Sequence, residues 1–210
     1  MSDNVLFASI NLPIGDWLKQ KMTTDIMAID VDRWWWDNYR GTHMLPLMTR
    51  GGIAGKHGAS NKRNEPFHWV QYTPISVRAW FDNVVFPWMG MRTRISALLM
   101  AAGTSNKEHI DCDLIKMGTR QHKFRCVIHG KTNTLYFKTQ GGDVYVPDIA
   151  TPFIMDGSWP HGMYNATGDN KLTLAVGSPW EGNSSYNNID IMMDKQDHIM
   201  PNNYKQYFQQ

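Results

Sequence analysis

The chain has 210 residues and a mass of 24.2 kDa, and its 21 lysines and arginines against 19 aspartates and glutamates give a net charge of +2. This length predicts one domain with its own core, and the scattered, nearly balanced charge excludes nucleic acid as the expected partner. Two cysteines, Cys112 and Cys126, are too few for a disulfide scaffold and suit a reducing compartment.

Nothing in the sequence is typical of a targeting or membrane-spanning segment. The first residues lack the basic and apolar regions of a signal peptide. The longest apolar stretch, residues 95–102, is far too short to cross a bilayer. We therefore expect a cytoplasmic protein without a membrane partner, and the sequence leaves its oligomeric state open.

The first 90 residues predict short strands and helices that flank the rest of the chain. Residues 5–12 are rich in β-forming side chains and predict a strand, residues 14–22 a short helix, and residues 44–48 a second strand. Residues 50–66, rich in glycine, lysine, asparagine and serine, predict a loop. That loop is either a lid or a solvated surface segment without a role.

The clearest helix is predicted over residues 76–86. Apolar residues recur three and four positions apart along one face, at Val77, Trp80, Phe81, Val84 and Val85. Ser76 is the predicted N-cap and Pro87 the predicted stop. We expect this face to pack on the outside of a sheet.

From residue 91 onward the hydrophobic period changes to two. Short strands separated by glycines are predicted at residues 95–100, 109–116, 121–129, 134–139, 143–146, 153–154 and 171–177. Such spacing is typical of an antiparallel sandwich or jelly roll. The predicted fold is therefore mainly β with flanking helices, around a double-stranded β-helix, or cupin-like jelly roll.

We expect this core to cover about residues 91–179 of a single domain, with residues 1–90 flanking it. Residues 180–210 form a polar C-terminal tail that is either disordered or packed back through Tyr204, Tyr207 and Phe208.

A candidate metal site lies within this core. His109 and Asp111 are two residues apart, so on a strand their side chains leave the same face. His161 can supply a third ligand on the same side of one ion. Two histidines and a carboxylate that leave the opposite face open form the facial triad of non-haem Fe(II) oxygenases.

Further polar residues accompany the triad. Alternation on the predicted strand places Arg120 and His122 on the face opposite to Lys123 and Arg125. Arg125 is then a solvated outer charge, or a pocket residue if a bulge shifts the register. Around His161 the chain reads Asp-Gly-Ser-Trp-Pro-His-Gly-Met-Tyr-Asn, and Lys171 follows ten residues after this histidine.

With these residues in place, the segment 94–179 resembles the aspartyl/asparaginyl β-hydroxylase-like branch of the Fe(II)/2-oxoglutarate-dependent oxygenases. The resemblance implies that His109, Asp111 and His161 bind Fe(II). It also implies that Arg120, His122 and Lys171 hold 2-oxoglutarate, and that Ser158 and Asn165 orient the ligands. Lys171 stands where the family usually has arginine, and it can pair with a carboxylate as a point charge but without the bidentate fork.

The resemblance further implies hydroxylation of an unactivated C–H bond with O2, releasing succinate and CO2 from 2-oxoglutarate. The substrate would be an amino acid, a peptidyl residue or another small metabolite. Two alternatives stay open: a cupin-type metal enzyme that does not use 2-oxoglutarate, and a non-catalytic jelly-roll binding protein.

Overall fold

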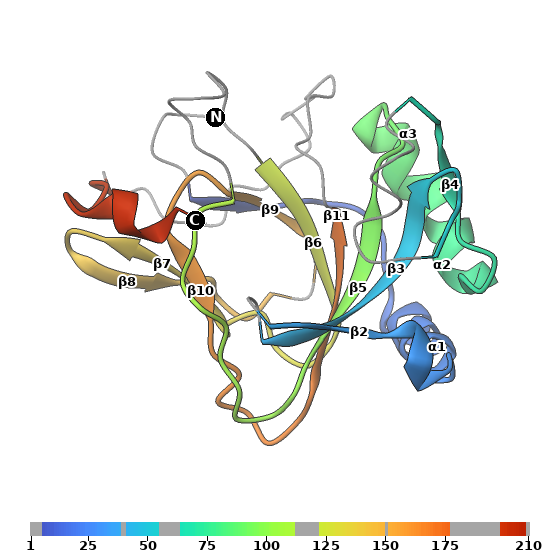
Figure 1. Ribbon diagram of the computed structural model, residues 1–210, viewed down its shortest axis with the longest axis horizontal. Coiled ribbons are helices and arrows are strands. Elements are labelled where there is room, and N and C mark those ends of the chain that lie inside the picture. The colour runs from blue at the N-terminus through green and yellow to red at the C-terminus, as the bar shows by residue number, and fades with distance from the viewer. Residues whose placement is uncertain are drawn as a thin grey trace.

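The computed structural model describes residues 6–38, 41–54, 64–111, 122–149, 151–176 and 198–208, and of His122 the backbone alone. Within these residues the chain forms two antiparallel sheets that face each other, with helices outside the larger sheet (Figure 1).

The larger sheet has the strand order β1-β9-β6-β11-β5-β3-β2, with β4 paired to β3 outside this path. In the described residues its strands are β1 (Phe7–Ser9), β2 (Trp35–Asp37), β3 (Thr42–Arg50), β4 (Phe67–Trp69), β5 (Ile95–Met100), β6 (His122–His129), β9 (Phe153–Asp156) and β11 (Lys171–Val176). The four central strands β5, β11, β6 and β9 form the wall that faces the smaller sheet (Figure 1).

The smaller sheet has the order β10-β7-β8, built from β7 (Leu135–Thr139), β8 (Gly142–Tyr145) and β10 (His161–Met163). Residues 105–110 extend it, because antiparallel bridges join Ser105 to Tyr164 and His109 to His161. The chain thus passes repeatedly from one sheet to the other between β5 and β11. This alternation is the double-stranded β-helix that the sequence predicted.

Helices cover the outer face of the larger sheet, as the apolar periodicity predicted. They are α1 (Asp16–Met27), α2 (Ile75–Trp80), the π-helical turn η3 (Phe81–Val85) and α3 (Phe86–Met89); short 3-10 turns are η1 (Val31–Arg33) and η5 (Tyr204–Tyr207). One core cluster joins Trp80 and Phe81 to Phe124 and Leu174 of the sheet. We call this cluster the outer core. It packs the helices against the face of the larger sheet that is turned away from the smaller sheet.

Two details of the predicted helix are wrong. Pro87 does not stop it: the π turn η3 precedes the proline, and the helix runs on to Gly90, whose φ of 72° ends it. A widened turn offers the space that a proline ring would lack in a regular helix. Ser76 is not the N-cap either, because Pro74 occupies that position and the Ser76 hydroxyl donates to Asp25 of α1.

A second core lies between the two sheets. It includes Phe7, Val127, Phe137, Phe153 and Met155. Alternation along β6 separates the two cores, since Phe124 and Cys126 belong to the outer core and Val127 to the inner one. The inner core fills part of the space between the two sheets.

The other predicted strands agree with the structure within a few residues, apart from the segment at 109–116. There, only residues 109 and 110 form bridges, and residues 112–121 lie outside the described part of the chain. So does most of the predicted loop, residues 55–63. The described C-terminal residues pack back, since the amide of Ile110 donates to Tyr207 at 2.9 Å. Among the described helices, none is long and apolar enough to cross a membrane.

Candidate metal centre

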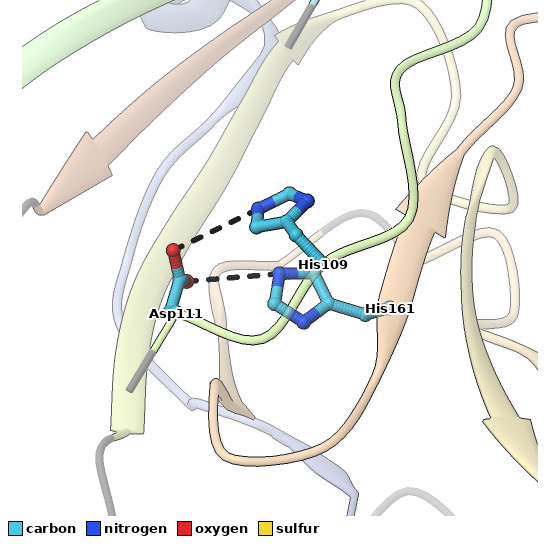
Figure 2. A group of neighbouring side chains, drawn as sticks. All are labelled: His109, Asp111 and His161. Atoms are coloured by element: carbon cyan, nitrogen blue, oxygen red, sulfur yellow. Dashed lines mark ion pairs between the residues drawn. The ribbon is translucent and has the colours of Figure 1, made fainter. Parts of the chain in front are cut away.

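His109, Asp111 and His161 converge on one point (Figure 2). His109 lies directly opposite His161, the first residue of β10, and the two exchange backbone hydrogen bonds of 2.9 Å in both directions. The amide of Asp111 donates to the carbonyl of Gly157, in the turn that precedes β10. Two segments distant in sequence are thereby fixed side by side through their backbones.

The ligand atoms of this triad are close and shielded. The Nε2 atoms of His109 and His161 lie 3.7 and 3.6 Å from the two carboxylate oxygens of Asp111. One ligand atom from each residue falls within 4.8 Å of the other two. All three side chains are at most 9% exposed.

Backbone carbonyls set the tautomer of both histidines. Nδ1 of His109 lies 2.9 Å from the carbonyl oxygen of Lys107, and Nδ1 of His161 lies 2.8 Å from that of Trp159. A carbonyl oxygen only accepts, so each Nδ1 carries the hydrogen and each Nε2 presents a lone pair toward Asp111. This is how proteins orient histidines as metal ligands.

The protonation states also suit metal binding. Burial lowers the pKa of His161 to about 3, so its imidazole is neutral at physiological pH. Burial alone would raise the pKa of the Asp111 carboxyl, but the neighbouring His161 and Lys123 lower it below its usual range. His161 is therefore a neutral imidazole beside a carboxylate, the protonation states that a metal ion requires of these two ligands.

This donor set fits Fe(II). Two imidazole nitrogens and one carboxylate oxygen on one side of an ion leave its other positions open. Both histidines are already held in the ligand tautomer, and all three donors converge without rearrangement. The residues present are thus consistent with a facial iron site.

The turn between β9 and β10 carries part of this geometry. The Ser158 hydroxyl and amide both donate to the Asp156 carboxylate, at 2.5 and 2.9 Å. This closed turn presents the Gly157 and Trp159 carbonyls, which hold Asp111 and His161. Ser158 thus acts on the ligands through the backbone, and it does not line the adjacent cavity.

A cavity adjoins the triad between the two sheets. His109 and His161 line it, together with apolar side chains of both inner faces: Leu98, Met100, Val127, Leu135, Phe153, Met155 and Met163. The described lining also has polar side chains, and two of them are the cations Arg125 and Lys171.

Lys171 begins β11 and is 3% exposed. Its ammonium group donates to the hydroxyl of Thr134, which is itself buried. Burial, helped by the positive charge of Arg125, lowers the pKa of Lys171 to about 7. Sequence reasoning found Lys171 but missed Thr134, because nothing in the sequence links positions 37 residues apart.

Of the two placements considered for Arg125, the solvated outer one is wrong. Arg125 lines the cavity, and the charges of Arg125 and Lys123 both act on Asp111. Alternation along β6, rather than a bulge, turns Arg125 inward. The pairing of β6 with β9 is regular from His122 to Arg125, and the one-residue shift against β11 lies farther on, between Val127 and His129. Arg120 and the side chain of His122 lie outside the described residues.

Asn165 does not reach the ligands or the cavity lining. Its buried amide nitrogen donates to the carbonyls of Ala101 and Asp169, at 3.2 and 2.8 Å, and its oxygen accepts from Thr167. Asn165 therefore ties the loop before β11 to the end of β5. The structure gives it a place in loop packing rather than in ligand orientation.

Replacing Asn165 with alanine is expected to destabilise the protein by about 2 kcal/mol, because buried carbonyls lose their donor. Metal affinity at low temperature should stay within about twofold, since no ligand is touched. Thermal unfolding and metal titration check this, with Asn170→Ala as an exposed control that loses one bond to Ala102. A selective loss of metal affinity without destabilisation would restore the predicted orienting role.

Comparison with solved structures supports the fold. A prolyl-4-hydroxylase from Pseudomonas putida superposes with a TM-score of 0.51 at 13% identity, over 86% of this chain and 95% of that one. A prolyl hydroxylase from Trichoplax adhaerens gives a TM-score of 0.49 at 14% identity, over 82% of this chain and 83% of that one. No protein-family model matches the sequence, and no curated protein does.

The chain has a double-stranded β-helix like that of the Pseudomonas putida prolyl-4-hydroxylase. Within it, His109, Asp111 and His161 form a triad consistent with a facial iron site.

Proposed function

We propose that this protein is an Fe(II)/2-oxoglutarate-dependent oxygenase that hydroxylates an unactivated C–H bond of an amino acid, a peptidyl residue or another small metabolite. Succinate and CO2 are the co-products. One observation carries the proposal: two of the three ligands, His109 and His161, line the same cavity as the buried Lys171. A metal site alone would fit many enzymes, whereas a buried cation beside it fits a co-substrate with a free carboxylate.

Each residue has a distinct task. His109, Asp111 and His161 hold Fe(II), which supplies the oxygen chemistry when bound with 2-oxoglutarate. Lys171 and Thr134 bind the far carboxylate of 2-oxoglutarate, one as a cation and the other as a hydroxyl donor. The apolar lining, including Leu98 and Phe153, excludes water around the reacting centre.

Assignment to the aspartyl/asparaginyl β-hydroxylase-like branch is a finer proposal. It is supported by the run from Asp156 to Asn165, in which Asp156 and Ser158 build the turn that holds the ligands. Arg120 and His122 belong to the same motif and are proposed as further 2-oxoglutarate contacts.

The test is the absorption of the protein under anaerobic conditions with Fe(II), before and after addition of 2-oxoglutarate. A keto acid that chelates the iron through two oxygens gives a visible charge-transfer band, and we expect this band to appear. Lys171→Ala should weaken 2-oxoglutarate binding by about tenfold to a hundredfold, the value of a charge-assisted hydrogen bond.

Lys131→Ala is the matched control, since Lys131 is an exposed lysine paired with Asp148, and it should leave the titration unchanged. Iron binding without a band at any 2-oxoglutarate concentration would favour a cupin-type enzyme instead. Failure to bind iron would favour a non-catalytic protein.

A further inference from the structure

Two polar side chains of the cavity, Thr42 and Asn106, have hydrogen-bonding groups that no other described residue satisfies. Thr42 begins β3 and is fully buried, and its hydroxyl has no hydrogen-bond partner in the part of the chain that the structure describes. Asn106 is 6% exposed, and its side-chain oxygen accepts from the amide of Met163. The other end of this carboxamide is therefore the nitrogen, and none of the described residues accepts from its two N–H groups.

These two groups lie at the same end of the cavity. Both Thr42 and Asn106 line it. Gly41, just before Thr42, has a φ of 58°, and a Cβ atom there would lie 2.7 Å from the carbonyl oxygen of Ser105 and 3.9 Å from Cα of Asn106. The absence of a side chain at Gly41 thus lets the start of β3 pack directly against the segment that carries Asn106.

Strand register places this end of the cavity away from Lys171. On the larger sheet, Lys171 of β11 lies opposite Met100 of β5. On the other side of β5, His43 of β3 lies opposite Leu99, so Thr42 continues this register opposite Met100. Neighbouring strands are about 4.8 Å apart, so Thr42 and Lys171 lie about 10 Å apart in one row of the sheet.

The smaller sheet has the same order. Leu135, which follows the Thr134 that binds Lys171, lies opposite Met163 of β10. On the other side of Met163, the backbone amide of Asn106 donates to its carbonyl at 2.9 Å. The cavity therefore has a cationic end at Lys171 and a neutral polar end formed by Thr42 and Asn106, which we call the neutral end.

The co-substrate does not reach the neutral end. His109 and His161 lie on the segment of Asn106 and on β10, whereas Lys171 donates to Thr134 beside β7. A 2-oxoglutarate molecule that extends from the metal to Lys171 therefore runs away from Asn106. The neutral end is left for the other organic molecule of the reaction, the substrate.

We propose that Thr42 and Asn106 bind an amide carbonyl oxygen of the substrate, from a peptide bond or from a side-chain carboxamide. A carbonyl oxygen has two lone pairs and accepts from a hydroxyl and an N–H group together. A carboxylate buried there would lack a cation, because the cations of the described lining, Lys171 and Arg125, lie two and three strands away from Thr42. This role rests on the proposed function and adds a determinant of its specificity.

Thermal unfolding of the ligand-free protein tests whether the Thr42 hydroxyl lacks a partner. Thr42→Val replaces the hydroxyl by a methyl group of similar size, so we expect Tm to rise by about 2–4 °C. Thr93→Val is the matched control. Thr93 is 1% exposed, its hydroxyl also has no partner among the described residues, and it does not line the cavity. Both variants should be stabilised.

Binding to the full chain, loaded with Fe(II) and 2-oxoglutarate without oxygen, separates the two variants. The probes are the N-acetyl N-methylamides of leucine and proline, free asparagine and glutamine, and free leucine and proline, which have no amide. Calorimetry and shifts of the charge-transfer band measure affinity. We expect at least one amide probe to bind about tenfold more tightly than free leucine and proline. The capped probes report a peptide carbonyl, and asparagine and glutamine report a side-chain carboxamide.

Thr42→Val should remove this preference, whereas Thr42→Ser and Thr93→Val should keep it. Asn106→Asp should also remove it, because aspartate still accepts from Met163 but has no N–H group to donate.

The proposal is wrong if no amide probe binds more tightly than the free acids, or if Thr42→Val keeps the preference. It is also wrong if Thr42→Val lowers Tm while Thr93→Val raises it, since the Thr42 hydroxyl would then already be satisfied. A loss of 2-oxoglutarate affinity in Thr42→Val, as in Lys171→Ala, would place Thr42 at the co-substrate instead. Absence of the charge-transfer band in the unaltered protein would refute the proposed function, and with it this role.

Discussion

Replacing Asp111 with alanine is expected to abolish iron binding and turnover while the fold survives. The carboxylate supplies the only negative charge of the triad and stands 3.6–3.7 Å from both histidine nitrogens. Its backbone amide keeps the bond to Gly157 in the variant, so the local path of the chain is preserved. We expect metal affinity to fall by more than about a hundredfold, beyond the effect of losing an outer-shell partner.

Metal content after dialysis, succinate formation and circular dichroism measure these three properties separately. Asp143→Ala is a suitable control, because Asp143 forms a more exposed ion pair with Lys138 on the smaller sheet. If the Asp111 variant kept full activity, the assignment of the triad would be wrong.

Replacing Lys171 with methionine is expected to eliminate 2-oxoglutarate binding and to stabilise the protein at the same time. A buried ammonium group is costly, and methionine fills a similar volume without charge. We expect a gain of about 1–3 kcal/mol at pH 7, within the range found when buried charges are replaced by apolar side chains. Thermal unfolding checks the gain, and the charge-transfer titration checks the loss.

The gain should depend on pH, and its sign follows from the lowered pKa of Lys171. Between pH 7 and about 10.4 the unfolded chain holds a proton on this lysine that the folded chain has lost. The destabilising effect of Lys171 is therefore full below pH 7 and fades as the pH rises through this window.

The affinity for 2-oxoglutarate should also depend on the protonation state of Lys171. Above pH 7 the free protein loses the Lys171 charge, so the apparent affinity falls by about tenfold per pH unit. Lys171→Arg should flatten this dependence, because a guanidinium group stays charged throughout. A pH-independent affinity in the unaltered protein would remove Lys171 from the co-substrate site.

Local pattern was enough to predict much of the fold. Alternation defined β5 and β11 within a residue, and the apolar stripe around Trp80 and Phe81 predicted the helix that covers the sheet. Local pattern failed where a neighbour in space decides the outcome. Pro87 continues the helix because of a π turn, and β10 is too short for its three residues to show a period.

The residues of the site also fall into those that the sequence could predict and those that it could not. His109, Asp111 and His161 could be predicted because residue type and spacing carry their chemistry. Neither Thr134 beside Lys171 nor the inward direction of Arg125 could be predicted, since one depends on packing across the sheets and the other on which face of β6 turns toward the smaller sheet. Asn165 is the opposite case. The sequence motif predicted a role beside the ligands, but its side chain bonds within the loop before β11.

The rigidity of the triad has a consequence for the identity of the bound ion. The carbonyls of Lys107, Trp159 and Gly157 fix the three ligands, so the backbone sets the site before any ion contributes. Nitrogen and oxygen donors in such an arrangement hold cobalt, nickel, copper and zinc more tightly than ferrous iron. For the proposed iron enzyme we therefore expect occupancy to depend on which ions the surroundings supply, and we expect competing metals to inhibit it.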